Sequence, residues 1–262
     1  MPNVAICSMF NDSIRRGDLA RYIRQIEAQD YPRDQLRVYA IEGDSVDQTY
    51  QRLMAWRQLD SRVTVGKCDL GQPVLGSVVD KGRFLRGNIV GSGCRQMALA
   101  DGWADYILWI ESDLIWGPYL VSQLVASAER LDAGLVAPWI YVRGGDWPAE
   151  WYGPLPGDES PETHYAALDT LPQSERLFYD TWAFRHLPDG KHFTLNEYAP
   201  GPMPFQVWSA GSCLLARADV VAKSNTPSDQ AIVGWCRQAI DQGATLWCDP
   251  AIGAWHKRMG EG

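Results

Sequence analysis

The chain has 262 residues, of which 46% are hydrophobic and 21% are charged, and its formal net charge at pH 7 is −8. This composition excludes a disordered chain and supplies enough apolar residues for a sizeable core. The acidic excess argues against a broad nucleic-acid-binding surface, because that affinity rests on Lys and Arg. The densest basic stretch, residues 81–95, leaves room only for a local basic groove.

Strand-like and helix-like segments alternate over the first half of the chain. Strands are expected where apolar residues run together, and helices where apolar residues recur every three or four positions. The expected strands are 4–10, 36–41, 62–67 and 105–110. The expected helices are 18–28, 47–59, 81–100 and 118–131. This alternation predicts an α/β fold with a Rossmann-like, mostly parallel sheet and helices on both of its faces.

The second half of the chain is less regular. Residues 143–204 are rich in Pro, Gly, Trp and Tyr, so an irregular insertion is expected there. The remaining expected elements are a strand at 134–141, a strand with a small-residue kink at 207–216, a helix at 228–242 and a strand at 244–248. Ser228 is the expected N-cap of that helix, and His256 follows the last strand.

The six Cys residues show no CxxC spacing and mostly stand among apolar or small residues. This pattern favours buried free thiols in a reducing compartment over a zinc site or disulfides. The sequence starts without a basic and apolar leader and has no run of about 18 apolar residues. We therefore expect a cytoplasmic protein, in a bacterial or viral-host cytosol, without a membrane partner.

The tripeptide Glu111-Ser112-Asp113 stands directly after the expected strand 105–110. Open α/β sheets bind ligands in the crevice outside the carboxyl ends of their strands. Carboxylate oxygens suit Mg²⁺ or Mn²⁺, which bind through one or two carboxylates together with substrate phosphates. The sequence thus predicts a site for such a cation. The alternative is that the two acids form only a turn and a helix N-cap.

The order of these elements resembles that of glycosyltransferases with the GT-A fold over nearly the whole chain. Glu111-Ser112-Asp113 is similar to their DXD signature, with Glu in the first place, and residues 29–32 resemble the start of family 2-type enzymes. The segment 177–185, followed by Gly190, resembles a motif of fungal capsule-associated α-mannosyltransferases and of yeast mannan polymerase subunits. The resemblance implies one GT-A domain over residues 1–262.

In that domain, residues 1–116 would form the nucleotide-sugar-binding half. Residues 117–262 would form the acceptor-binding half, with the insertion 143–204 on the acceptor side. The implied activity is a metal-dependent transfer of a sugar from a nucleoside-diphosphate donor, of UDP or GDP type, to an acceptor hydroxyl. The implied cofactor is Mn²⁺ or Mg²⁺, because the leaving diphosphate develops negative charge that needs a cation.

The resemblance also assigns roles to individual residues. Asp113 would bind the metal directly, Glu111 would help through the ribose or a metal-bound water, and His256 would be a third ligand rather than a surface histidine. The donor-binding residues that it implies are Ser8, Glu42, Asp44, Arg95, Glu111, Trp182 and Trp208. The alternatives are a polar turn at residues 42–45, an ordinary helix-surface position for Arg95, and core or loop packing for the tryptophans.

Two acids compete for the catalytic role. Asp229 stands where inverting family 2-type enzymes have the general base that deprotonates the acceptor hydroxyl, although an acid in a first helical turn is also favoured by the helix dipole. Asp180 lies in the Tyr-Asp-Thr-Trp string, which in retaining mannosyltransferases is near the donor sugar. Both the retaining and the inverting outcome therefore remain open.

The acceptor is a glycan or a small molecule in the leading interpretation. A second interpretation is a phage-type enzyme that glycosylates a hydroxymethylated base in DNA, in which the Trp-rich insertion would hold the flipped base. A third is a non-catalytic sugar-binding protein with the same fold. A nucleotide-sugar pyrophosphorylase is disfavoured, because residues 8–12 contain no Gly-rich signature. The donor base, the sugar and the oligomeric state are not specified by the sequence.

Overall fold

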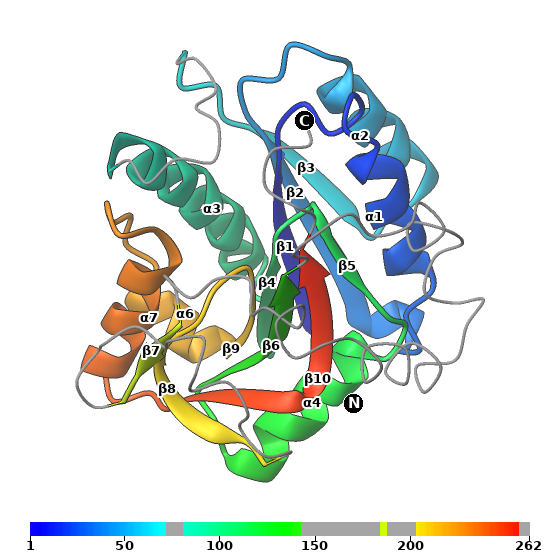
Figure 1. The fold of residues 1–262 in the computed structure, drawn as a ribbon. Coiled ribbons are helices and arrows are strands. Elements are labelled where there is room, and N and C mark those ends of the chain that lie inside the picture. Colours follow the sequence, from blue (N-terminus) through cyan, green and yellow to red (C-terminus); the bar gives the residue numbers. More distant parts are fainter. Residues whose placement is uncertain (72–80, 143–183, 188–202, 257–262) are drawn as a thin grey trace.

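The computed structural model describes residues 1–71, 81–142, 184–187 and 203–256 (Figure 1). Its strands are β1 (Val4–Phe10), β2 (Leu36–Glu42), β3 (Val63–Lys67), β4 (Tyr106–Ile110), β5 (Leu114–Trp116), β6 (Leu135–Val142), β7 (Arg185–His186), β8 (Phe205–Ser209), β9 (Cys213–Arg217) and β10 (Leu246–His256). Its helices are α1 (Asp18–Glu27), α2 (Thr49–Leu59), α3 (Lys81–Asp101), α4 (Leu120–Leu131), α6 (Ala218–Ser224) and α7 (Ala231–Asp241), with a 3₁₀ turn at Arg33–Gln35.

One sheet of ten strands runs through the described residues in the order β3-β2-β1-β4-β9-β6-β10-β8-β7, and β5 pairs with β10. The strands β3, β2, β1 and β4 are parallel to one another. All residues of β1 except Met9 are buried, as is typical of parallel strands covered on both faces. The expected α/β fold with a mostly parallel central sheet is confirmed, and antiparallel pairs are added on the side of β9, β8 and β5.

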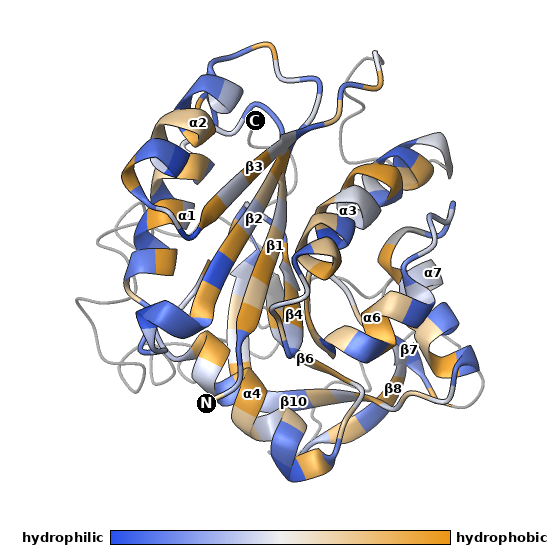
Figure 2. Ribbon diagram, turned by 180° about the vertical axis from the view of Figure 1, so that it is seen from behind, coloured by the Kyte–Doolittle hydropathy of each residue, from blue (hydrophilic) through white to orange (hydrophobic). Residues whose placement is uncertain are grey.

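Helices cover both faces of this sheet. Figures 1 and 2 show α1 and α2 together on one side and α3, α6 and α7 together on the other. The inner face of α1 buries Leu19, Tyr22 and Ile26, at the three- and four-residue spacing that predicted the helix. Because β4, β6 and β10 run in the same direction as β1, their carboxyl ends lie at one edge of the sheet.

The single kinked strand expected at 207–216 is wrong, because two strands occupy this segment. β8 pairs with β10 and β7, whereas β9 lies between β4 and β6. The chain turns between them at Ala210–Ser212, and Ser212 adopts a left-handed φ of 60°. The turn was hidden in the sequence because the small residues that form it continue a run of apolar character.

Three further boundaries differ from the expectation. The short strand β5 separates Asp113 from α4, and β10 continues to His256, so this histidine ends the strand rather than following it. α7 begins at Ala231, and Ser228 lies outside the helix, where its hydroxyl oxygen accepts a hydrogen bond from the backbone of Gln230. The local sequence pattern does not predict these helix and strand ends, because they depend on pairing with distant segments of the chain.

The six cysteines are free thiols, five of them buried. Among the described residues, no helix combines the length and apolar character needed to cross a bilayer. The expectation of an irregular insertion at 143–204 falls mostly outside the described residues. Within it, Phe184 is fully buried and packs against Trp139, with ring centroids 6.4 Å apart.

Candidate functional site

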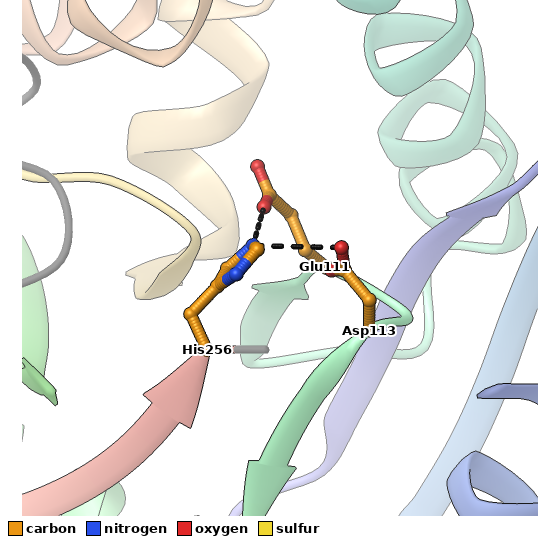
Figure 3. Close-up of side chains that lie close together, drawn as sticks. All are labelled: Glu111, Asp113 and His256. Carbon is orange, nitrogen blue, oxygen red and sulfur yellow. Dashed lines mark ion pairs between the residues drawn. The ribbon is translucent and has the colours of Figure 1, made fainter. Parts of the chain in front are cut away.

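Three side chains from distant parts of the chain converge at the carboxyl edge of the parallel strands (Figure 3). Glu111 follows β4, Asp113 precedes β5, and His256 is the last residue of β10. The Nε2 atom of His256 lies 3.5 Å from Oε2 of Glu111 and 3.5 Å from Oδ2 of Asp113. The structure thus brings together the three residues that the sequence predicted as metal ligands.

Strand pairing sets this arrangement. β10 and β5 are antiparallel with His256 opposite Leu114, so the imidazole comes next to Asp113 across the ladder. The backbone N–H of Glu111 donates to the carbonyl oxygen of Ser212 (2.9 Å), and the N–H of Leu114 donates to the carbonyl oxygen of Glu111 (3.2 Å). These bonds fix the acid-x-acid turn from both sides.

A buried layer supports the turn from below. The Ser8 hydroxyl donates to the carbonyl oxygen of Ile110 (2.6 Å), and it accepts a hydrogen bond from the hydroxyl of Tyr22 (2.7 Å), since a carbonyl oxygen can only accept. The Tyr22 ring meets Trp116 edge-on, with centroids 5.4 Å apart. The structure therefore places Ser8 in the floor under Glu111, fully buried, with its hydroxyl engaged in the core.

The carboxylates of the site lie in a partly enclosed environment. The side chains of Asp113 and Glu111 are 33% and 29% exposed, and that of His256 is 7% exposed. Burial raises the pKa of the Asp113 carboxyl above its usual range; His256 and Arg16 act in the opposite direction, and Glu111 raises it further. A cation placed between the carboxylates would relieve this penalty.

The donor atoms fit a single divalent ion. They all lie within 4.8 Å of one another. With bonds of about 2.1 Å, two ligands at a right angle around a metal are about 3 Å apart and two opposite ligands are about 4.2 Å apart. Small rotations of the three side chains would therefore satisfy one ion. Two carboxylates and one imidazole suit Mn²⁺ better than Mg²⁺, which prefers oxygen ligands.

A cluster of charges beside Asp113 escaped the sequence reasoning. Asp18 is fully buried at the start of α1 and pairs with Arg16 (3.1 Å) and with Arg21 (2.6 Å). Arg21 also donates to the carbonyl oxygen of Asp113 (3.2 Å). The only signal in the sequence is the alternation of Arg and Asp around Gly17, which takes a left-handed φ of 71° at the helix start.

The loops after β2 and β3 are tied together at the same edge of the sheet. Glu42 is buried; its Oε1 accepts from the backbone of Ser45 (2.8 Å), and its Oε2 lies 3.6 Å from Nζ of Lys67. The Asp44 carboxylate accepts from the backbone N–H groups of residues 70 (3.1 Å) and 71 (3.0 Å). Both acids thus shape these loops, and the sequence prediction that they meet the donor stays a prediction.

Arg95 lies in the packing between α3, β4 and α7. Its guanidinium is 4.3 Å from the ring centre of Trp235 and 5.3 Å from that of Trp109, and its Nε donates to the side-chain oxygen of Asn225 (2.8 Å). A Cβ on Gly91 would lie 2.9 Å from the Trp109 ring, so glycine makes room for this stack. Burial lowers the pKa of Arg95 to about 10. The structure does not place Arg95 among the three converging side chains.

The remaining predicted residues lie between positions 180 and 229. Asp229 is exposed in the turn that precedes α7, and Trp208 is half-buried in β8. Asp180 and Trp182 lie outside the described residues. Their predicted roles remain predictions.

Comparisons with known proteins identify the fold of the chain through solved structures. No protein-family model matches the chain, and no curated protein matches it significantly. The solved structure of S. aureus TarS 1-349 in complex with UDP-GlcNAc aligns with 98% of this chain and 58% of its own, at a TM-score of 0.54 and 11% identity. The chain has the GT-A fold. The same TarS fragment with UDP aligns with a TM-score of 0.53 and 10% identity, over 98% of this chain and 60% of its own.

A second protein with this fold is the mannosyltransferase PcManGT from Pyrobaculum calidifontis, solved in complex with GDP-Man and Mn²⁺. It aligns with 97% of this chain and 56% of its own, at a TM-score of 0.54 and 12% identity. The chain thus spans 56–60% of the length of these structures. The finer resemblance to fungal capsule-associated and mannan polymerase enzymes stays a prediction.

Proposed function

We propose that the chain is a metal-dependent glycosyltransferase that moves a sugar from a nucleoside-diphosphate donor to the hydroxyl of a glycan or a small molecule. The observation that carries the proposal is the convergence of Glu111, Asp113 and His256 at the edge of the sheet where open α/β folds bind ligands. It is supported by neighbours of the same fold whose structures hold UDP-GlcNAc, or GDP-Man with Mn²⁺.

In this proposal Asp113 and His256 bind Mn²⁺, and Glu111 completes the protein ligands directly or through a bound water. When bound, the ion supplies positive charge against the negative charge that develops on the diphosphate leaving group. Beneath Glu111, the Ser8 hydroxyl holds the end of β4 through the carbonyl oxygen of Ile110, and Tyr22 in turn donates to Ser8. A preorganised site of this kind needs little rearrangement during the reaction.

On the acceptor side, we propose Asp229 as the general base that takes the proton of the attacking hydroxyl. A solvent-exposed carboxylate in a turn can approach an acceptor hydroxyl. Asp180 is the rival for this role or for holding hydroxyls of the donor sugar. Trp182 and Trp208 are proposed to stack on a sugar or a base.

The first experiment is a thermal-shift screen of UDP, GDP and their sugar conjugates, with and without Mn²⁺. A ligand at 100 times its dissociation constant adds about 2.7 kcal/mol to the free energy of unfolding. For a chain of this size that is an increase in Tm of about 5 °C. A shift that requires both the metal and one nucleotide series supports the proposal and identifies the donor base. The absence of a shift with every nucleotide contradicts it.

Turnover separates the enzyme from the non-catalytic alternative. Product formation from the identified donor, with simple sugars and polyols offered as acceptors, should stop in EDTA and return with Mn²⁺. Donor binding without hydrolysis or transfer to any acceptor would favour the non-catalytic sugar-binding protein. Transfer to DNA that contains hydroxymethylated bases, and to no glycan, would favour the DNA-modifying enzyme.

A further inference from the structure

Three polar side chains of α1 donate hydrogen bonds to the backbone of one distant segment, residues 113–117. The bonds run from Arg21 Nη2 to the carbonyl oxygen of Asp113 (3.2 Å), from Gln25 Nε2 to that of Leu114 (3.4 Å) and from Gln29 Nε2 to that of Gly117 (3.1 Å). Side chains four residues apart lie on the same side of a helix. One side of α1 therefore follows the chain from the metal-binding turn to the end of β5.

Leu114 is the point of this segment at which the three proposed metal ligands are linked. It directly follows Asp113, and it stands opposite His256 in the pairing of β5 with β10. Its backbone N–H donates to the carbonyl oxygen of Glu111 (3.2 Å). A displacement of Leu114 would thus be transmitted to all three ligands, and Gln25 is the side chain of α1 that bonds to this residue.

The stability of the fold gives no reason for an amide at position 25. Gln25 is 1% exposed, and among the described residues its Oε1 atom has no hydrogen-bond partner. A buried polar atom without a partner is unfavourable, and an apolar side chain of the same length would avoid this cost. What the amide adds is its bond to the carbonyl oxygen of Leu114.

Gln29 has the opposite character, although it is the same residue type on the same side of the helix. Its Nε2 donates to the carbonyl oxygens of Gln25 (2.9 Å) and Gly117 (3.1 Å), and its Oε1 accepts from the backbone N–H of Val121 (3.3 Å). Both ends of this amide are engaged. Gly117 follows the last residue of β5, so these bonds fasten the end of the strand that points away from the ligands.

We infer that Gln25 is a positioning residue of the metal site, which acts through Leu114; this inference rests on the proposed function. By restraining Leu114, Gln25 restrains Glu111, Asp113 and His256 before the ion arrives. Groups that hold metal ligands from outside the coordination shell raise metal affinity, because less freedom is lost when the ion binds.

The test compares the parent with Gln25→Met and Gln29→Met, using Mn²⁺ alone as the probe. Methionine is unbranched and a good helix former, so each variant removes the amide and keeps the helix. In Gln25→Met, we expect the affinity for Mn²⁺, measured by calorimetric titration, to fall about fivefold to tenfold. Its Tm in EDTA should stay within about 2 °C of the parent, because the lost bond is offset by removal of the unpartnered oxygen.

Gln29→Met is the matched control, and it should show the reverse pattern. Loss of its three hydrogen bonds should lower the Tm in EDTA by about 3–6 °C. Its affinity for Mn²⁺ should stay within about twofold of the parent value. The two glutamines would then separate metal affinity from stability, which a merely structural role for both cannot do.

The outcomes distinguish this inference from the proposed function. If the parent binds no Mn²⁺, the metal-dependent function and the role of Gln25 both fail. If the parent binds Mn²⁺ and Gln25→Met binds it equally well, the proposed function stands and the inference is overturned. It is also overturned if both variants lose affinity in proportion to their loss of Tm. Gln25→Leu, which fills the same space with a different shape, decides the question if Gln25→Met does not fold.

Discussion

Replacement of Asp113 by asparagine tests the metal site through two opposite effects on stability. The variant keeps the shape of the side chain and removes its charge. Without metal, the charged carboxylate is unfavourable in its enclosed position, since burial and the nearby Glu111 raise its pKa. We therefore expect Asp113→Asn to raise the Tm of the metal-free protein. With metal, the same change removes a ligand and should abolish the stabilisation.

The sizes of both effects follow from the structure. The Asp113 side chain is 33% exposed, so solvent screens part of the unfavourable charge, and the metal-free gain should stay near about 1 kcal/mol, or about 2 °C. For the parent, Mn²⁺ at 100 times its dissociation constant adds about 2.7 kcal/mol, or about 5 °C. If the variant binds Mn²⁺ about 100-fold more weakly, the same concentration adds only about 0.4 kcal/mol, which is a shift of less than about 1 °C.

The assay is thermal denaturation of the parent, Asp113→Asn and Asp132→Asn, each in EDTA and over a series of Mn²⁺ concentrations. Asp132 is the control, because its side chain is 98% exposed at the end of α4 and its left-handed φ of 46° suits asparagine. The control should respond to Mn²⁺ like the parent.

Two results would refute the reasoning. A variant that keeps the full Mn²⁺-dependent shift would show that Asp113 does not bind the ion. A metal-free variant that melts below the parent would show that Asp113 serves mainly as an ion-pair partner of a protonated His256, from which it is separated by 3.5 Å.

The other predictions concern stability, catalysis and the buried arginine. A hydrogen bond from Arg62 lowers the pKa of Asp60 to about 2, so its stabilisation is present at neutral pH and is lost as the pH falls from about 4 through about 2. Asp60→Asn should cost about 2 kcal/mol at pH 7 and less than about 0.5 kcal/mol at pH 2, as measured by denaturant unfolding. Asp229→Asn should lower kcat about 100-fold or more and leave donor affinity unchanged if Asp229 is the base, and an unaltered kcat would transfer this role elsewhere. Arg95→Lys should lower the free energy of unfolding by about 1–3 kcal/mol, since lysine cannot reproduce the stack and the bond to Asn225; a weaker diphosphate affinity at unchanged Tm would instead support the role predicted from the sequence.

The sequence predicts most elements of the parallel half because their signals are local. β1 was expected at residues 4–10 and occupies Val4–Phe10, since strands covered on both faces read as continuous apolar runs. The acid-x-acid turn was found in the same way, from its place after β4. His256 was matched to the site by resemblance, and its approach to Asp113 depends on the pairing of β10 with β5, which no local pattern encodes.

Polar residues were harder to place, because their environment is set by partners elsewhere in the chain. Ser8 and Arg95, which the resemblance assigned to donor binding, are both buried and are hydrogen-bonded to Tyr22 and Asn225, and their role toward a donor stays a prediction. The sequence analysis made no prediction for the cluster in which Arg16 and Arg21 pair with the buried carboxylate of Asp18. Charge and hydrogen-bonding capacity can be read from a sequence, but the enclosure of a polar group cannot.

The irregular middle of β10 determines how far this strand reaches. Asp249 pairs with Pro138 and Gly253 with Trp139, so three residues of β10 are looped out against a single step of β6. The looped-out segment begins with a proline, which has no N–H to donate to a ladder and is tolerated at such a bulge. Ser127 and Arg130 hold the bulge in place by hydrogen bonds to the carboxylate of Asp249. Because an odd number of residues is looped out, side-chain alternation is inverted beyond the bulge relative to an uninterrupted strand. In an uninterrupted strand Gly253 would pair with Val142, whereas the looped-out residues bring His256 to that position, opposite Leu114 of β5, so the bulge determines which residue of β10 reaches the acid-x-acid turn.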